Sequence, residues 1–290
     1  MKRLLALWYP VITLSAILLS IILLPGCIFA DTDDLYEERM EKIKQGAAEQ
    51  RLKESKETVE EAYGANEKST FTPHDLNYAI IGEDDALMQI SFKYRLGRDW
   101  NTYLAFTSVV KWDIWKDSSP YQDINFKPEI FYRFTPENEN LVSLDTGYWH
   151  ESNGRDGDES RSWDQLFARV NTLFELNSIA LAWETTFYGE IATGGNEDIG
   201  DYLGWWDTTF YFLNILPTDK FNIDLEFHIW SGKDGNPFNH GQFQTGVIYK
   251  IENAVFQPSL YVQYFSGYGE VMADYDVYTV AWRVGLAFLY

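Results

Sequence analysis

From residue 77 to the carboxyl terminus, apolar and polar residues alternate with a period of two. The alternation is clearest in residues 88–96, 179–188 and 221–229. Successive side chains of a β-strand point to opposite faces, so each segment is predicted to be a strand with one apolar and one polar side. In the first segment the apolar side consists of Met88, Ile90, Phe92, Tyr94 and Leu96.

An apolar side that faces lipid and a polar side that lines an interior are typical of transmembrane β-barrels. A soluble sandwich could have the same period with its apolar sides packed together. Aromatic residues make up 17% of the chain, and such residues gather at both interfaces of a membrane, which favours the barrel. Bacterial barrels have even strand numbers, so the roughly eleven strands between residues 87 and 290 need a twelfth, which we place at residues 77–81. We therefore expect an all-β, transmembrane antiparallel β-barrel of about twelve strands.

The polar sides of these strands carry charged residues that a twelve-stranded barrel would enclose. Such a barrel is narrow and can be filled largely by inward side chains, so we expect no wide pore. His228 is expected to be a lumen residue with a satisfied hydrogen bond and not a catalyst. The expected interior network consists of Arg169, Glu184, Glu190, Asp224, Glu226, His228 and Arg283.

The first 30 residues differ from the rest of the chain, and residues 1–30 are predicted to be a secretory signal. Lys2 and Arg3 form a basic end, and residues 4–24 are apolar. A stretch of this length could instead anchor the chain in a membrane as a helix. Cys27 ends a segment that resembles a bacterial lipoprotein box, so lipidation of Cys27 is a further alternative. Because Cys27 is the only cysteine, a disulfide within the chain is excluded.

Residues 31–70 form a second region of different composition. They are rich in Glu, Lys, Gln and Ala and contain no proline. We expect a charged helical or disordered extension in the periplasm, either solvated or binding a partner there. The barrel domain is then predicted to span residues 71–290. The net charge of the chain, −21, excludes nucleic acid as a partner because its phosphates would be repelled.

Residues 148–166 contain the side chains most suited to chemistry. They are predicted to form two strands joined by a polar turn at residues 153–158. His150 and Ser152 share the apolar side of the first strand, and Asp164 lies on the apolar side of the second. If the strands pair in register, these residues form a base, a nucleophile and an orienting carboxylate, the set that activates a serine. A structure in which Asp164 points into the lumen would exclude this triad.

The same stretch resembles the outer membrane phospholipase A family. That family carries a His-x-Ser-Asn-Gly-Arg run followed by Ser-Arg-Ser-Trp-Asn. Here residues 150–155 read His-Glu-Ser-Asn-Gly-Arg, and residues 160–164 read Ser-Arg-Ser-Trp-Asp. Further similar segments are residues 73–78, 118–120, 125–129 and 266–275. The resemblance covers residues 71–290 and leaves out the first 70 residues.

The resemblance implies an enzyme that releases fatty acids from membrane phospholipids, with phospholipase A1 or A2 activity, as a multi-pass barrel of the bacterial outer membrane. It implies that Ser152 is the nucleophile, that His150 accepts its proton and that Asp164 orients His150. The backbone N–H of Gly154 would stabilise the oxyanion. These roles are carried over from the family's motif to the matching positions of this chain.

The resemblance also implies calcium and a second copy of the chain. Calcium would bind the backbone carbonyl of Arg155 and the hydroxyl of Ser160. Ser118 of a second subunit would complete the site, so the active form would be a homodimer. All three ligands are oxygen atoms, which calcium prefers.

The chain departs from the family's pattern at three places. Residues 111–116 lack an obvious match to the buried polar residue of the family's dimer contact. Asp164 stands where the best-known members have asparagine, and residues 192–196 lack the acid expected at a second calcium site.

Two other functions stay open beside the phospholipase. One is a lipid A deacylase, which also carries His-x-Ser on the outside of a barrel, although the Asn-Gly-Arg context argues against it. The other is a non-enzymatic outer-membrane barrel.

Overall fold

The structure is a computed structural model that describes residues 34–63, 71–97, 100–138, 140–177, 179–215, 222–250 and 258–288. The predicted signal at residues 1–30, with Cys27, lies outside the described residues. The chain divides into two units, residues 1–46 and 47–290, and the strands belong to the second.

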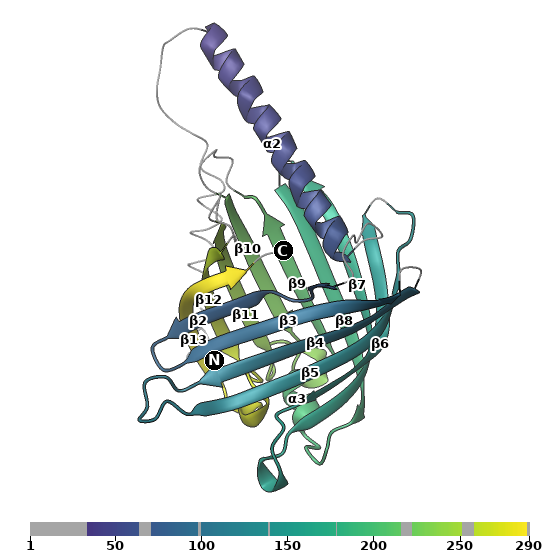
Figure 1. The fold of residues 1–290 in the computed structure, drawn as a ribbon, viewed down its shortest axis with the longest axis vertical. Helices are drawn as coiled ribbons and strands as arrows, with labels where there is room; N and C mark the ends of the chain where they lie inside the picture. Colours follow the sequence, from purple (N-terminus) through teal and green to yellow (C-terminus); the bar gives the residue numbers. More distant parts are fainter. Residues whose placement is uncertain are drawn as a thin grey trace. The chain divides into compact units, whose positions relative to one another are not determined.

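Twelve antiparallel strands of the described chain close into one barrel (Figure 1). Each strand pairs with its neighbours in the sequence, and the last returns to the first, with Arg283 opposite Gly82 and Phe288 opposite Asn77. The predicted all-β barrel of about twelve strands is therefore confirmed. The strands are β2 (Asn77–Gly82), β3 (Ala86–Gly97), β4 (Trp100–Trp112), β5 (Tyr121–Phe134), β6 (Leu141–Ser152), β7 (Ser162–Leu176), β8 (Ile179–Ala192), β9 (Trp206–Leu213), β10 (Asn222–Trp230), β11 (Gln242–Lys250), β12 (Pro258–Gly267) and β13 (Thr279–Phe288).

The outside of the barrel is apolar and its inside is polar. On β4 and β5, Leu104 is 43% exposed and Ile130 is 44% exposed. Glu129 and Arg133, which flank Ile130 on the other side of β5, are buried. A soluble sandwich would bury its apolar sides, so that alternative is excluded. Other exposed apolar residues of the outer surface are Ile90, Leu166, Trp183, Phe187, Val262 and Val284.

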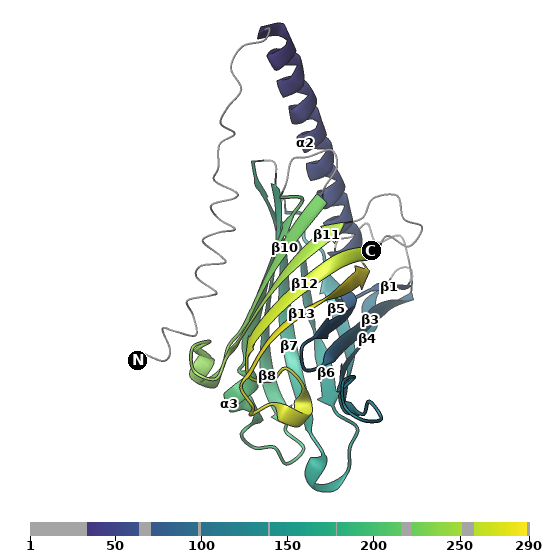
Figure 2. The same ribbon diagram turned by 90° about the vertical axis from the view of Figure 1, so that its left-hand side faces the viewer.

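The two ends of the barrel can be told apart by their loops. The helix α3 (Ile199–Leu203) and three short 3-10 turns lie in the loops that follow β6, β8, β10 and β12. Figure 2 shows these loops gathered at one end. Outer-membrane barrels have short periplasmic turns and longer extracellular loops, so this is the extracellular end.

The segment between the short strand β1 and the strand β2 brings charged residues into the lumen. The short strand β1 (Phe71–Pro73) pairs with β3, with Phe71 opposite Tyr94, while β2 pairs with the other part of β3. The residues between β1 and β2 turn inward, where His74 is 3% exposed and its ring stacks on Phe131. Period-two reasoning could not predict this, because the segment is not a continuous strand.

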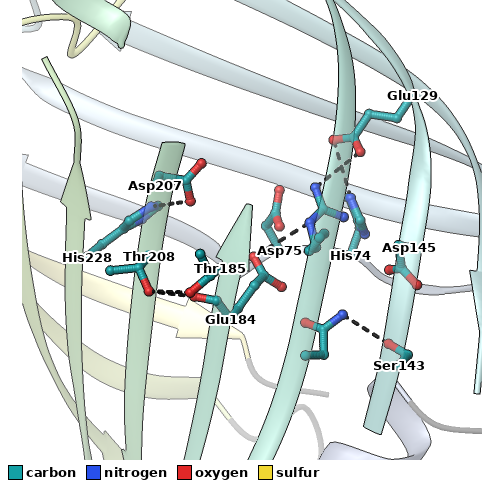
Figure 3. Close-up of polar contacts among 12 residues, drawn as sticks. His74, Asp75, Glu129, Ser143, Asp145, Glu184, Thr185, Asp207, Thr208 and His228 are labelled. Carbon is teal, nitrogen blue, oxygen red and sulfur yellow. Dashed lines mark hydrogen bonds and ion pairs between the residues drawn. The ribbon is translucent and has the colours of Figure 1, made fainter. Parts of the chain in front are cut away.

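Ion pairs connect this segment to the barrel wall. Nε2 of His74 lies 3.3 Å from Oε1 of Glu129. Arg169 lies 3.4 Å from the other oxygen of Glu129 and 3.7 Å from Glu184. Figure 3 shows His74, Asp75, Glu129 and Glu184 facing one another in the lumen. This part of the lumen is therefore occupied by paired charges.

The expected interior network is correct in most of its members. Arg283 is buried and bonds Asp85, and Asp224 is buried beside Lys250. His228 bonds Asp207 at 3.1 Å through Nε2, as expected of a satisfied lumen histidine. Glu190 was predicted wrongly: its side chain is exposed, because β8 extends beyond the filled part of the lumen at the extracellular end. The remaining predicted members, Arg169, Glu184 and Glu226, line the interior cavity.

The charged region before the barrel, expected to be helical or disordered, contains the helix α2 (Asp34–Tyr63). Its second half, which belongs to the barrel unit, is not fully solvated. Val59 is 5% exposed and packs with Leu52 against inward-facing residues of the barrel, among them Leu173 and Ala180. Ser55 also bonds Asn214, and Lys56 pairs with Glu175. No helix of the described chain is long and apolar enough to cross a membrane.

Candidate active site

The candidate site lies on the β6–β7 hairpin at the extracellular end. The two strands pair in the register that the sequence required, with His150 opposite Asp164 and Ser152 opposite Ser162. Side chains of the neighbouring positions Trp149 and Trp163 point inward and are buried. His150, Ser152 and Asp164 therefore share the outer face of the barrel.

His150 and Asp164 are in direct contact. Nδ1 of His150 lies 2.8 Å from Oδ1 of Asp164, which is hydrogen-bond distance. The side chains are 36% and 23% exposed, respectively. Asp164 does not point into the lumen, so the arrangement that would have excluded the triad is absent at this hairpin. This carboxylate can hold the imidazole in one orientation and leave Nε2 available for proton transfer.

Ser152 ends β6 on the same face as His150, two positions further along. Within the described chain its hydroxyl forms no hydrogen bond with the imidazole. Residues two apart in a strand are separated by roughly 6.5–7 Å, so this bond depends on how the two side chains rotate. Catalytic hydrogen bonds are often long without substrate and tighten when it binds. The structure thus brings two predicted residues into contact and places the third beside them.

Asn153 organises the turn that follows Ser152. Its Oδ1 accepts hydrogen bonds from the backbone N–H of Arg155 at 3.3 Å and of Arg161 at 2.9 Å. Its Nδ2 donates to the carbonyl of Glu159 at 2.9 Å. The residue is 5% exposed. One buried amide therefore connects both ends of the turn, a role that sequence reasoning missed although asparagine is common in turns.

Gly154 has a backbone conformation and a position that suit glycine. Its φ is +64°, in the left-handed region, and a Cβ there would lie 3.2 Å from the ring of Phe126. Phe126 is opposite Ser152 in the β5–β6 pairing. A larger residue would be strained by the backbone and would press on this ring, so this position of the turn requires glycine.

The predicted calcium ligands lie on exposed loops. Arg155 and Ser160 belong to the turn that Asn153 organises, and among the described residues neither the Arg155 carbonyl nor the Ser160 hydroxyl takes part in a hydrogen bond. Both atoms are oxygens and fit calcium. Ser118 lies on the β4–β5 loop with φ +65° and an exposed side chain, where a second subunit can approach. No group of three His, Cys, Asp or Glu residues suited to a metal occurs in the described chain.

The side chain of Arg155 anchors this turn to β5. Its guanidinium bonds the carbonyl of Gln122 and lies 3.6 Å from Asp123. Asp123 in turn accepts a hydrogen bond from the backbone N–H of Ala273 at 2.7 Å. The candidate calcium loop is therefore tied to the wall and to the β12–β13 loop.

An aromatic contact packs the other extracellular loops against the same turn. Arg161 lies 5.8 Å from the ring centre of Tyr275, whose hydroxyl donates to Asp198 at 2.6 Å. Burial, followed by the hydrogen bond to Asp198, raises the pKa of Tyr275 above its ordinary value. A tyrosine is protonated at neutral pH even at its ordinary pKa, and the raised pKa lets Tyr275 keep donating this bond at higher pH.

The lumen holds a second group of polar residues, around a cavity of about 250 Å³. Asp75, Glu184, Asp207, Glu226 and His228 line it. His228 is already bonded to Asp207, and its ring stacks on Trp230 with centres 3.3 Å apart. The outer face, with a histidine and carboxylate beside a serine, is the better candidate for catalysis.

The closed barrel has an apolar outer face and a polar lumen, and these features define an outer-membrane β-barrel. Residues 52–288 match the Phospholipase A1 family. The chain belongs to the phospholipase A1 family.

Individual relatives agree with this assignment. Phospholipase A1 of Klebsiella pneumoniae is 30% identical over 217 residues, which cover 70% of this chain and 70% of the relative. Phospholipase A1 of Escherichia coli K12 is 28% identical over 240 residues, which cover 71% of this chain and 77% of the relative.

Solved structures share the fold. Outer membrane phospholipase A from Escherichia coli superposes with a TM-score of 0.65 at 22% sequence identity, over 80% of this chain and 96% of that one. The Salmonella typhi outer membrane phospholipase, described as a dimer with bound calcium, superposes with a TM-score of 0.64 at 22% identity, over 80% and 96%. The twelve-stranded barrel is thus the fold of that enzyme.

Proposed function

We propose that this protein hydrolyses acyl esters of membrane phospholipids at the outer face of the bacterial outer membrane, with Ser152 as the nucleophile. The observation that carries the proposal is the contact between His150 and Asp164 beside Ser152 on the outer face. A site on that face meets its substrate laterally, since phospholipids surround the barrel. Both phospholipase A1 and A2 specificity are included, because the site as described does not select one ester.

The reaction follows from the order of these groups. His150 takes the hydroxyl proton of Ser152 through Nε2 while the serine oxygen attacks the ester carbonyl. Asp164, on Nδ1, orients the ring and stabilises the imidazolium that forms. His150 then gives the proton to the leaving lysophospholipid oxygen. Water, activated by the same imidazole, releases the fatty acid and restores Ser152.

The negative charge that develops on the carbonyl oxygen needs donors close to Ser152. The N–H of Gly154 is two residues from the nucleophile and is fixed by the turn that Asn153 organises. An N–H of this kind stabilises the oxyanion in acyl transfer. We assign this role to Gly154.

We extend calcium and dimerisation to this chain from the relative described as a calcium-bound dimer. The Arg155 carbonyl and the Ser160 hydroxyl would hold the ion, with Ser118 of the partner subunit. When bound, calcium supplies positive charge beside the oxyanion. The separate loops that carry Ser118 and Ser160 fit a site that two copies complete together.

Export and anchoring are part of the same proposal. Residues 1–30 act as the secretory signal, residues 31–70 form a periplasmic extension, and residues 71–290 form the barrel. The docking of Val59 and Ser55 at the end of the lumen supports an extension that stays close to the barrel.

The test is release of fatty acid from phospholipid in mixed micelles, with calcium or with EDTA. Ser152→Ala should lower the rate by about 10⁶-fold, as loss of a catalytic serine does, and EDTA should abolish release by the unchanged protein. Ser108→Ala is the matched control, because Ser108 is an outward serine of β4 at the same level as Ser152 and is separated from it by the strand β5.

The alternatives predict different results. Release that survives Ser152→Ala would overturn the assignment of the nucleophile. Absence of release from a folded barrel with calcium would overturn the phospholipase, and lipid A would then be the next substrate to test. Equal release with EDTA would remove calcium from the mechanism.

A further inference from the structure

A tyrosine on the outer face contacts the proposed orienting carboxylate. The hydroxyl of Tyr148 donates a hydrogen bond to Oδ1 of Asp164 at 2.5 Å. The same oxygen is 2.8 Å from Nδ1 of His150. One carboxylate oxygen therefore accepts from two donors, both of which lie on β6.

The hairpin register explains how Tyr148 reaches this position. Asp164 is directly opposite His150, and Leu166 is directly opposite Tyr148. Tyr148 and Asp164 are thus diagonal neighbours on one face of an antiparallel pair. Diagonal positions are roughly 7–8 Å apart, which a tyrosine can span.

The surroundings of Asp164 give this hydrogen bond its importance. Acids of the lumen, such as Asp85 and Glu129, have Arg or Lys partners. Among the described residues, the ion pairs of Asp164 include His150 and no Arg or Lys. A carboxylate on a lipid-facing surface is costly unless donors stabilise it. Tyr148 supplies a neutral donor where no fixed cation is present.

We propose that Tyr148 is a positioning residue for catalysis: its hydroxyl holds the Asp164 carboxylate in the rotamer that orients His150. This inference rests on the proposed function of Ser152, His150 and Asp164. Without the hydroxyl, the Asp164 side chain keeps a single hydrogen bond within the described part of the chain, that of His150, and can rotate away from the imidazole. The tyrosine acts through Asp164 and takes no part in proton transfer.

The test compares Tyr148→Phe with Tyr132→Phe, each in the unchanged protein and in an Asp164→Ala background. Tyr132 is an outward tyrosine on the neighbouring strand β5, 41% exposed, and so a matched control. We expect Tyr148→Phe to lower kcat by about 10-fold, the effect of one hydrogen bond to a charged group, with KM unchanged. In the Asp164→Ala background Tyr148→Phe should have no further effect.

Two assays on the same variants keep the two proposals distinguishable. One measures fatty acid release from phospholipid. The other measures the rate at which a long-chain alkylsulfonyl fluoride sulfonylates Ser152 with loss of fluoride, which reports the activated serine without requiring phospholipid as substrate. In both assays Tyr132→Phe should match the unchanged protein.

Each outcome decides a point. Equal kcat for Tyr148→Phe and Tyr132→Phe, or an equal loss with and without Asp164, would overturn the role of Tyr148 and leave the phospholipase standing. Sulfonylation that is slowed by Tyr148→Phe in a protein that releases no fatty acid would overturn the substrate and support Tyr148. Absence of both reactions in the unchanged folded protein would overturn both proposals.

Discussion

Two aspartates on the strand β6 and its hairpin partner β7 show how differently the two sides of this barrel treat a negative charge. Asp145 faces the lumen and receives two hydrogen bonds from Arg133, at 2.8 and 2.7 Å. Their side chains are 0% and 1% exposed. Asp164 faces outward, is 23% exposed, and contacts His150 and Tyr148.

The difference lies in what can change during a reaction. The guanidinium of Arg133 is always charged, so the lumen pair has one fixed electrostatic state and serves to hold two strands together. The imidazole of His150 can gain and lose a proton, so Asp164 is placed to stabilise a charge that appears and disappears. A carboxylate paired with a permanent cation would be less able to do so.

The largest expected effect comes from breaking the lumen pair. Arg133→Met leaves the buried Asp145 without the cation that hydrogen-bonds it, although Arg169 still lies opposite it on β7, and this should lower the free energy of unfolding by about 3 kcal/mol. Guanidinium unfolding of the barrel in detergent micelles measures this. The double variant Arg133→Met with Asp145→Leu is the control and should recover most of the loss, because neither member of the pair is then left buried without the other.

Because Arg133 lies in the lumen and not on the outer face, folded Arg133→Met should release fatty acid at a rate close to that of the unchanged protein. A loss of stability below about 1 kcal/mol would mean that the pair contributes no more than an exposed one. An equal loss in the double variant would point to packing, for instance of Arg133 on the ring of Tyr103, in place of charge.

Much of this arrangement follows from the sequence. Strict alternation predicts the strands, and strand parity places His150 and Asp164 on the outer face. Register does not follow from parity alone, because a shift by two residues would also keep both apolar sides outward; the structure supplies it, with His150 opposite Asp164. Asp145 and Arg133 fall on the inner face by the same parity.

Other parts depend on geometry that no local pattern contains. His74 enters the lumen because the chain is not a continuous strand between β1 and β2. Glu190 has inward parity but is exposed, since parity does not say where the filled lumen ends. The charged composition of residues 31–70 gave no sign that Val59 of α2 packs against the barrel. Tyr148 has the right parity, but its contact with Asp164 depends on side-chain rotation.

A smaller effect is expected at the turn that separates the two strands. Asn153→Ala removes three hydrogen bonds that shape the candidate calcium loop, which should raise the calcium concentration for half-maximal fatty acid release by about 10-fold. At saturating calcium the rate should recover in large part. Calcium titration of the release assay measures both.

Asn138→Ala is the matched control, since Asn138 shapes the β5–β6 turn at the other end of the barrel by accepting from Asn140 and Leu141. It should leave the calcium dependence unchanged. A calcium midpoint that is the same for Asn153→Ala and the unchanged protein would separate Asn153 from the ion site. The outer face would then depend on calcium, if at all, through other residues.

The smallest effect concerns pH and an acid of the lumen outside the strands. Burial opposes the charge of Asp85, but hydrogen bonds and charge from Arg283, at 2.6 and 2.8 Å, with Lys111 nearby, hold the pKa of Asp85 below its ordinary value. Because the pKa of Asp85 is lower in the folded state, ionised Asp85 stabilises the fold above the unfolded pKa of about 3.9. This stabilisation is lost as the pH falls through the pKa of the folded state.

Asp85→Asn should therefore lower the free energy of unfolding by about 1 kcal/mol at pH 7, and its difference from the unchanged protein should shrink as pH falls below about 4. Unfolding curves at several pH values measure this, with the exposed neighbour Asp84→Asn as control. A difference that is constant with pH would mean that Asp85 contributes by shape and not by charge. Lumen and outer face would then differ less than proposed, since this lumen acid would not depend on its paired cations.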